Sequence, residues 1–459
     1  MELPNFFFAD LPPEATLSPA MIAEACEVLK HNREKHLLPR TTREIVKTLC
    51  GVAAEWLQPD NPFRRLALER GPAETGFSRA VLETGLDDFF RRFTPENFRA
   101  LLRQELGNAV SLTGDGCLAV GDEESAGPAV RHFWRGPEFL VHIAAGNLPN
   151  PALMSLTLGL LTRSAQFMKC AHGAAFLPRL FAHSLYAADH KLASCLEIAE
   201  WRGGNHELES VLFAAADCLT ATGGDDTLAA IRARLPAHVR FLGYGQRVSF
   251  GFVTREVLRD ETIGQVVARA ADDVVAWDQN GCLSPHVIYV EERGAVESDQ
   301  FAERLALELA ERETRLPRGK ISVEESALIV SRRGIHETLA VQRADVKIWS
   351  SHDSTAWTVV FEHDVRFQFS CLNRFIYVKP VPDVAAVLQG VDAVSGKVST
   401  VGIAAPPERT RELARQFAGW GATRVCPLGR MQNPPLTWRH DGRPALGDLL
   451  TWTDCENEA

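Results

Sequence analysis

The sequence predicts an α/β protein in which a helical region precedes two blocks of alternating strands and helices. Three observations support this class. Apolar residues recur at helical spacing within residues 18–107, apolar runs alternate with helix-like stretches over residues 138–245, and a second alternation fills residues 246–430. The chain has 459 residues, 46% hydrophobic and 24% charged, which is enough for about three domains and a sizeable core.

The bulk composition argues against nucleic-acid binding and against a membrane-spanning protein. The formal net charge is −10, and Lys and Arg are dispersed along the chain. No apolar run approaches the roughly 20 residues that cross a bilayer. Ten cysteines without close pairing, together with a start that lacks the features of a signal peptide, predict a cytoplasmic protein.

Residues 1–111 are expected to form helices that pack on the first α/β domain. Ser18, Thr42 and Thr94 each open a helix, and apolar residues at three- and four-residue spacing follow each of them. Such spacing puts the apolar side chains on one face of each helix, where they can be buried.

Residues 112–137 change in pattern to short segments punctuated by Gly and Asp, such as 117–120 and 132–134. This pattern favours a β-hairpin, which would serve as an arm or as a crossover between domains.

Residues 138–245 predict an α/β domain built on a doubly wound parallel sheet. Each expected strand is followed by a helix-like stretch. These strands are Phe139–Ala145, Ala165–Met168, Cys195–Ala199 and Cys218–Thr222. Ligands of such sheets bind at the carboxyl ends of the strands.

Residues 246–430 predict a second α/β domain, which carries Cys282. Its expected strands lie near 248–253, 286–290, 325–330, 356–361, 374–379, 398–403 and 423–426. Its expected helices lie near 261–276, 298–311 and 407–419.

Two loops and one strand end in the first domain carry candidate ligand-binding residues. Asn147 lies in a strand-to-helix loop, where its amide could donate to an oxyanion, although a helix cap or a turn is the more common role there. Lys169 at a strand end suits a ribose or phosphate, and a solvated lysine is equally ordinary. Thr222, Gly223 and Gly224 precede a helix whose N–H groups could face a phosphate, or they could form a tight turn.

Cys282 is the candidate nucleophile of the second domain. It stands in the polar, glycine-adjacent segment 278–284, directly before an apolar run, whereas a structural cysteine usually has apolar neighbours on both sides. Asp278 and His286 flank it and are candidates for tuning its reactivity. The motifs of metal sites, serine hydrolases and P-loops do not occur in the sequence, so no metal is expected.

An ordered set of motifs resembles the aldehyde dehydrogenase superfamily, specifically its LuxC-like acyl-CoA reductase branch of fatty acid reductases. The set consists of Gly-Asn-Leu-Pro at 146–149, Phe-Met-Lys at 167–169, Thr-Gly-Gly at 222–224 and Asp-Gln-Asn-Gly-Cys-Leu-Ser at 278–284. Further similar segments are Asn373–Phe375, Val378–Pro380, Trp438–Pro444 and Leu450–Trp452. The resemblance extends over residues 138–455.

The resemblance implies an aldehyde-dehydrogenase-like fold, with a Rossmann-type dinucleotide-binding domain at 138–245, an α/β catalytic domain at 246–430 and a small β oligomerisation element at 112–137. The C-terminal segment 431–459 would return to the cofactor domain and the oligomerisation element. The resemblance also implies a role for each candidate residue. Cys282 would be the nucleophile and Asn147 an oxyanion donor. Lys169 and Thr222 with Gly223 and Gly224 would bind a nicotinamide dinucleotide.

Two departures from the wider superfamily bear on direction and on the cofactor. Aldehyde-oxidising members carry a glutamate base where this chain has Leu242–Gln246, which contains no carboxylate, and this absence favours reduction. Glu362 is a candidate for the ribose-binding glutamate or for another base, although a charged loop is the more ordinary interpretation.

The second departure follows Lys169, because no acidic residue stands three positions later as it does in NAD-preferring members. The position is His172, so a 2′-phosphate is not repelled and NADPH is expected, with NADH also possible. His172 could contact that phosphate or be an ordinary surface histidine.

The predicted function is the NADPH-dependent reduction of an acyl thioester to an aldehyde through an acyl-cysteine on Cys282. The acyl donor is expected to be acyl-CoA or an acyl-carrying partner protein, and the chain is expected to form a homo-oligomer. The alternatives are an aldehyde dehydrogenase that works in the oxidative or CoA-acylating direction, or a non-catalytic acyl-transfer subunit of a complex.

Overall fold

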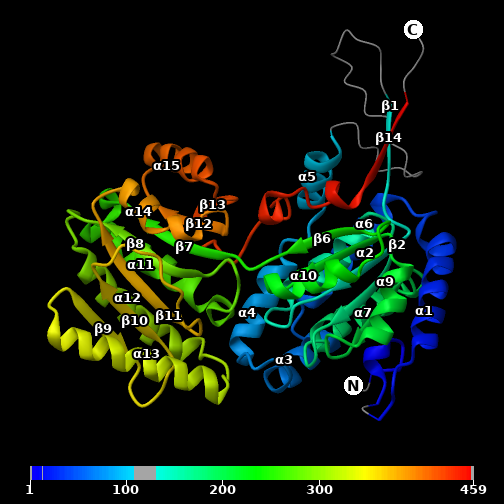
Figure 1. The fold of residues 1–459 in the computed structure, drawn as a ribbon, viewed down its shortest axis with the longest axis horizontal. Coiled ribbons are helices and arrows are strands. Elements are labelled where there is room, and N and C mark those ends of the chain that lie inside the picture. The colour runs from blue at the N-terminus through cyan, green and yellow to red at the C-terminus, as the bar shows by residue number, and fades with distance from the viewer. Residues whose placement is uncertain (1–2, 13, 108–130, 456–459) are drawn as a thin grey trace, which may run out of the picture. The chain divides into compact units, whose positions relative to one another are not determined.

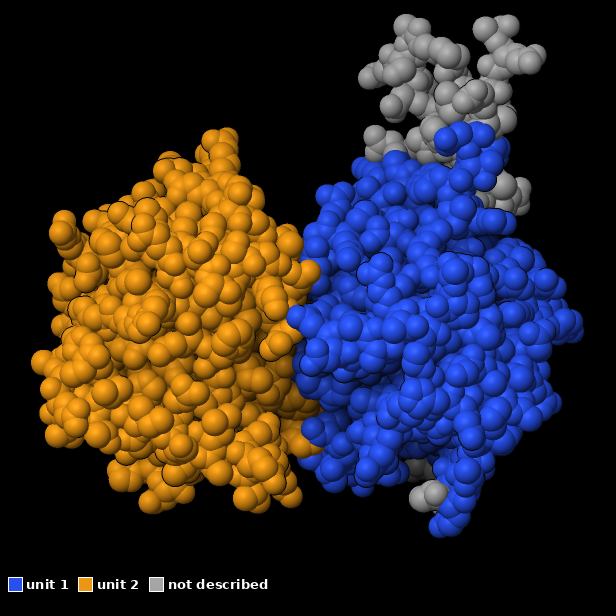
Figure 2. Space-filling model, viewed as in Figure 1, with its two compact units in different colours: residues 1–75, 86–245, 435–459 blue, residues 76–85, 246–434 orange. Residues whose placement is uncertain are grey.

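The computed structural model describes residues 3–12, 14–107 and 131–455 of a chain that divides into two compact units, shown in Figure 1 and Figure 2. Unit 1 comprises residues 1–75, 86–245 and 435–459, and unit 2 comprises residues 76–85 and 246–434. The short segment Gly76–Gly85 thus belongs to unit 2, although it lies within the helical part of the sequence.

Five α-helices lie between residues 14 and 107. They are α1 (Pro19–Asn32), α2 (Thr42–Trp56), α3 (Pro62–Thr75), α4 (Arg79–Phe90) and α5 (Pro95–Leu106). Ser18 and Thr94 cap α1 and α5 by accepting backbone N–H groups, as the sequence predicts. α2 begins at Thr42, and the cap is the preceding Thr41, which forms a capping box with Glu44.

Unit 1 contains a five-stranded parallel sheet in the order β4-β3-β2-β5-β6. The strands are β2 (Phe139–Ile143), β3 (Ala165–Cys170), β4 (Leu196–Glu200), β5 (Cys218–Thr222) and β6 (Arg240–Tyr244). The connecting helices are α6 (Asn150–Leu161), α7 (Phe176–Ala188), α8 (His190–Ala193), α9 (His206–Ala215) and α10 (Asp225–Arg234). The predicted Rossmann-type sheet is confirmed, with β6 as a strand that was not predicted.

Helices on both faces bury this sheet, which explains why its strands are continuous apolar runs. On one face, Phe139 and Val141 of β2 pack against Ile22 of α1 and Leu212 of α9. All six residues of β3 are buried. Among the helices of the described residues, none is both long and apolar enough to cross a membrane.

A separate two-stranded sheet joins distant parts of the chain. β1 (Arg131–Arg135) pairs antiparallel with β14 (Thr451–Cys455). The hairpin expected over residues 112–137 falls largely outside the described residues. Its described strand, β1, pairs with β14 near the C-terminus.

Unit 2 contains a seven-stranded sheet in the order β13-β12-β7-β8-β11-β10-β9, in which only β9 runs antiparallel to its neighbour. The strands are β7 (Val248–Val253), β8 (Pro285–Glu291), β9 (Val346–Ser350), β10 (Thr358–Glu362), β11 (Phe375–Val381), β12 (Val398–Ala404) and β13 (Arg424–Pro427). The helices are α11 (Asp260–Val275), α12 (Ser298–Arg315), α13 (Val323–Gln342), α14 (Val384–Gly390) and α15 (Pro407–Trp420).

The strand predicted at 325–330 is wrong, because these residues lie in helix α13. Ser322 accepts the N–H of Glu325, and the Glu325 side chain accepts the N–H of Ser322, so the segment begins with a capping box. The buried residues Ile329, Arg333 and His336 follow at helical spacing. The Ser-x-x-Glu signal was present in the sequence, but the apolar run after it resembles a strand.

Candidate active site

The predicted cofactor residues of unit 1 lie at the carboxyl edge of its parallel sheet. β2 ends at Ile143, which lies opposite Lys169 of β3 and Ala221 of β5. The chain moves to opposite sides of β2 to form β3 and β5, so the topological switch point lies between β2 and β5. The structure thus brings the loop of Asn147, Lys169 and Thr222–Gly224 to one edge, where ligands of this sheet class bind.

Asn147 is exposed in the loop between β2 and α6. The N-cap of α6 is Pro149, two residues later, so helix capping is not the role of Asn147. The start of the loop is fixed, because the N–H of Ala144 donates to the Lys169 carbonyl at 3.0 Å.

Lys169 is the penultimate residue of β3, and only 5% of its surface is exposed. Burial lowers the pKa of its ammonium group, against the opposing effect of carboxylates that include Glu209 and Glu200. Its Nζ lies 5.9 Å from the ring centre of Trp201. A buried cation at the carboxyl edge of the sheet is not the solvated surface lysine that the sequence also permitted.

The two glycines after β5 are not required by the local backbone. Neither Gly223 nor Gly224 has a positive φ, and a Cβ on Gly224 would meet nothing within 4 Å. The open space in front of Gly224 would admit the close approach of a ligand. Asp225 and Asp226 occupy the first turn of α10, so their carboxylates compete with any phosphate for the positive end of that helix.

Glu200 lies beside the loop that follows Lys169, although the sequence does not place it there. As the last residue of β4 it lies opposite Cys170, and its carboxylate accepts the N–H groups of Gly173 at 2.7 Å and Ala175 at 3.2 Å. His172 Nδ1 is 3.1 Å from the same carboxylate. The pairing of β3 with β4 is the only signal for this contact, and it is a property of the folded sheet.

Cys282 lies in the turn between the 3₁₀ helix η4 (Ala276–Gln279) and β8, and its side chain is partly exposed. Its neighbours Gly281, Leu283 and Ser284 are buried. Ser249 Oγ donates to the Cys282 carbonyl at 2.8 Å, and the N–H of Ser284 donates to the Gly281 carbonyl. The turn is thus anchored on both sides of a cysteine that remains accessible.

The two titratable residues that flank Cys282 have other partners. Asp278 is buried and paired with Arg374 at 2.6 Å. His286 Nδ1 accepts the backbone N–H of Ser370 at 3.1 Å, and burial lowers the pKa of His286 to about 4. His286 is therefore neutral at pH 7, and its Nδ1 is not available to take a proton from the thiol.

Glu362 lies at the opposite edge of the unit 2 sheet from Cys282. β8, β11 and β10 are parallel, and the first residue of β10, Thr358, lies opposite Phe375 at the start of β11. Glu362 is the last residue of β10, whereas Cys282 precedes the first residue of β8. The four-residue rise from Thr358 to Glu362 separates the amino and carboxyl ends of these strands by about 13 Å. Glu362 therefore does not fold toward Cys282 as a substitute base.

The surroundings of Glu362 differ from the charged loop considered from the sequence. Its side chain is buried, and Oε1 pairs with Lys379 Nζ at 2.8 Å while Oε2 lies 3.7 Å from His336. Burial alone would raise the pKa of Glu362, but the hydrogen bond with His336 and the charge of Lys379 outweigh burial and lower the pKa.

The segment Leu242–Gln246 contains no carboxylate, but the fold brings one to it. A Cβ added to Gly245 would lie 2.7 Å from Oδ1 of Asp225. Asp225 begins α10 and is exposed. This carboxylate belongs to α10 and not to the segment 242–246, so the sequence of that segment alone does not reveal it.

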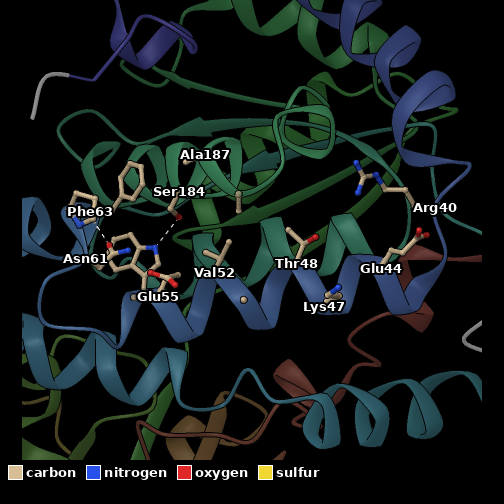
Figure 3. A pocket seen from close by; sticks show the side chains of 14 residues that line it. Arg40, Glu44, Lys47, Thr48, Val52, Glu55, Asn61, Phe63, Ser184 and Ala187 are labelled. Atoms are coloured by element: carbon tan, nitrogen blue, oxygen red, sulfur yellow. Dashed lines mark hydrogen bonds between the residues drawn. The ribbon is translucent and has the colours of Figure 1, made fainter.

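A cavity of about 670 Å³ lies elsewhere in unit 1, against α2 and α7 (Figure 3). Val52, Trp56 and Phe63 provide apolar lining, and the Trp56 indole donates to Ser184 Oγ at 2.9 Å. None of the predicted site residues lines this cavity.

The architecture defines the class of protein. Solved structures with the same fold include an NAD-dependent benzaldehyde dehydrogenase from Corynebacterium glutamicum, with a TM-score of 0.69 and 15% identity over 96% of this chain and 91% of that chain. Another is the putative aldehyde dehydrogenase PutA from Anabaena variabilis, with a TM-score of 0.68 and 15% identity over 96% and 93%. The chain has the aldehyde dehydrogenase fold.

The family is more specific. The family model described as "Acyl-CoA reductase (LuxC)" matches residues 37–452, so the chain belongs to the LuxC acyl-CoA reductase family. Similar curated proteins are named long-chain acyl-protein thioester reductase: one from Vibrio harveyi is 25% identical over 71% of this chain and 65% of its own length, and one from Photobacterium leiognathi is 24% identical over 69% and 63%. The matched region is thus less than two thirds of each relative.

Proposed function

We propose that this protein reduces an acyl thioester to an aldehyde through an acyl-cysteine on Cys282, with NADPH as reductant. The observation that carries the proposal is the partly exposed Cys282 in a turn where its neighbours Gly281, Leu283 and Ser284 are buried. Membership of the acyl-CoA reductase family and the names of the curated relatives support this reaction class.

Cys282 carries the acyl group through two successive steps. Its thiolate attacks the thioester carbonyl, the carbonyl oxygen becomes an oxyanion, and the donor thiol leaves to give the acyl-cysteine. We assign Asn147 and the Cys282 backbone N–H as donors to the oxyanion. A bound nicotinamide supplies the hydride that reduces the acyl carbon. The resulting thiohemiacetal breaks its C–S bond, which releases the aldehyde and returns the thiolate to Cys282.

The reductive direction rests on the slow hydrolysis of the acyl-enzyme. Aldehyde oxidation needs a base that activates water, and Leu242–Gln246 offers none from its own side chains. Glu362 lies at the opposite edge of the sheet from Cys282, which leaves Asp225 beside Gly245 as the carboxylate to test.

The residues at the switch point of unit 1 fit a nicotinamide dinucleotide. Lys169 is a buried cation at the carboxyl end of β3, and a Cβ on Gly224, which follows β5 at the same edge, would meet nothing within 4 Å. NADPH is favoured because the residue three positions after Lys169 is His172 and not a carboxylate that would repel a 2′-phosphate. The nearby carboxylate of Glu200 is occupied by the N–H groups of Gly173 and Ala175. We assign Glu362 a structural role with Lys379 instead of ribose binding.

The acyl donor is proposed to be a protein-bound acyl group, following the names of the curated relatives, with acyl-CoA as the alternative. Absorbance of the reduced nicotinamide would be followed with NADPH or NADH and either donor, in the intact protein and in Cys282→Ala. Oxidation that depends on the thioester and disappears in Cys282→Ala supports the proposal. Cofactor reduction by free aldehydes without a thioester would refute the direction, and the absence of any acyl adduct on Cys282 would refute the mechanism.

A further inference from the structure

Two segments of unusual backbone conformation meet beside the Cys282 turn. Trp277, Asp278 and Gln279 have φ values of 51°, 51° and 64°, and Leu372, Asn373 and Arg374 have 57°, 53° and 65°. L-residues rarely adopt this left-handed region, and three in succession persist only where surrounding contacts hold them. The first segment ends three residues before Cys282.

A buried ion pair connects the two segments. Arg374 Nε donates to Asp278 Oδ1 at 2.9 Å, and Nη2 lies 2.6 Å from the same oxygen. Asp278 Oδ2 accepts the N–H of Gly319 at 3.0 Å. Arg374 is 0% exposed and Asp278 2%, so water cannot replace these partners if one is removed.

Further contacts fix both sides of the pair. Arg374 Nη1 donates to Glu313 Oε2 and to the Leu316 carbonyl, both at 2.8 Å. The Gln279 amide donates to the carbonyls of Pro285 at 2.7 Å and Phe375 at 2.9 Å, across the start of β8 and β11. The turn that carries Cys282 is therefore attached to the neighbouring strand through its left-handed residues.

We propose that Arg374 is a positioning residue for Cys282: by holding Asp278 in its left-handed conformation, it fixes the turn that directs the thiol outward. The inference rests on the proposed role of Cys282 as nucleophile. It assigns Arg374 no contact with substrate or cofactor.

A buried arginine also stabilises a fold, so the test needs a matched control. Glu291 provides one, because it is 0% exposed and paired with Arg409 at 2.9 Å and Arg255 at 3.2 Å. It ends β8, whereas Asp278 precedes the start of that strand. Glu291→Gln thus removes a buried carboxylate from its ion pairs at the opposite end of β8, where the arginine partners are 34% and 35% exposed.

The experiment compares Arg374→Gln, Arg374→Lys, Arg374→Gln with Asp278→Asn, and Glu291→Gln in the full chain. The rate of iodoacetamide alkylation at Cys282 is measured by peptide mass spectrometry, with Cys50 of unit 1 as internal reference, at a temperature well below the melting point of every variant. The rate of acyl-adduct formation at Cys282 is then measured with an acyl-CoA thioester.

A displaced thiol should be acylated about tenfold or more slowly in Arg374→Gln. Alkylation at Cys282 should change by a similar factor relative to Cys50, and Arg374→Lys should recover part of the rate. The double variant removes both charges of the Arg374–Asp278 pair and leaves Glu313 without its arginine partner, so it should recover part of the melting temperature but not the Cys282 rate. Glu291→Gln should lower the melting temperature and leave the Cys282 rate unchanged.

A wild-type alkylation ratio in Arg374→Gln, or equal losses in Arg374→Gln and Glu291→Gln, would overturn the positioning role. Alkylation needs neither substrate nor cofactor, so it tests this inference even if the proposed reduction fails. Conversely, wild-type protein that alkylates normally at Cys282 but is acylated neither by acyl-CoA nor by a protein-bound acyl donor would refute the proposed function and leave the role of Arg374 in thiol reactivity intact.

Discussion

Replacing Glu362 with glutamine tests whether this residue stabilises the fold or binds the cofactor. The substitution removes the carboxylate that neutralises Lys379, which is 0% exposed and is otherwise held by the carbonyls of Asp364 at 2.6 Å and Arg366 at 2.8 Å. Breaking a buried ion pair by removing one partner costs about 3–5 kcal/mol, and the two remaining carbonyls favour the lower figure. At roughly 2–4 °C per kcal/mol for a unit of this size, the melting temperature should fall by about 6–12 °C.

The assay pairs thermal unfolding with the KM for NADPH, measured below the melting temperature of the variant. We expect a large fall in melting temperature with an unchanged KM, because Glu362 lies about 13 Å across the sheet from the edge of Cys282. Glu362→Asp, which keeps the charge, should recover part of the stability. An unchanged melting temperature with a raised KM would refute the structural assignment and support ribose binding.

Three further predictions test other parts of the site. Asp225→Asn should leave the slow hydrolysis of the acyl-enzyme unchanged in a quench assay, whereas a clear decrease would identify Asp225 as a water-activating base. His172→Ala should raise the KM for NADPH more than that for NADH if the imidazole faces the 2′-phosphate; equal changes would contradict this. Burial lowers the pKa of both His142 and His286 from 6.5 to about 4. Between pH 6.5 and 4 the unfolded state binds a proton at each of these histidines that the folded state does not bind. The free energy of unfolding should therefore fall on acidification over this range, by about 3 kcal/mol for each histidine. Urea unfolding of His286→Asn should show a smaller fall than the intact protein, and an equal fall would argue against a neutral buried His286.

The sequence is informative where the signal is local. Ser18 and Thr94 identify helix starts because capping depends on a side chain and the next few N–H groups. The Rossmann-type sheet follows from apolar runs that alternate with helices. α13 shows the limit of this approach, because an apolar run after Ser322 suits a strand as well as a helix.

The sequence by itself determined the α/β class, the order of the motifs and the candidacy of Cys282, since these depend on residue type and spacing along the chain. The tertiary structure decided which groups meet: Glu200 reaches the loop after Lys169 through strand pairing, and Glu362 pairs with Lys379 at the far edge from Cys282. Arg374 and Asp278, 96 residues apart, meet only because β11 lies beside β8. Strand order and register bring distant residues together, and no local pattern in the chain encodes that distance.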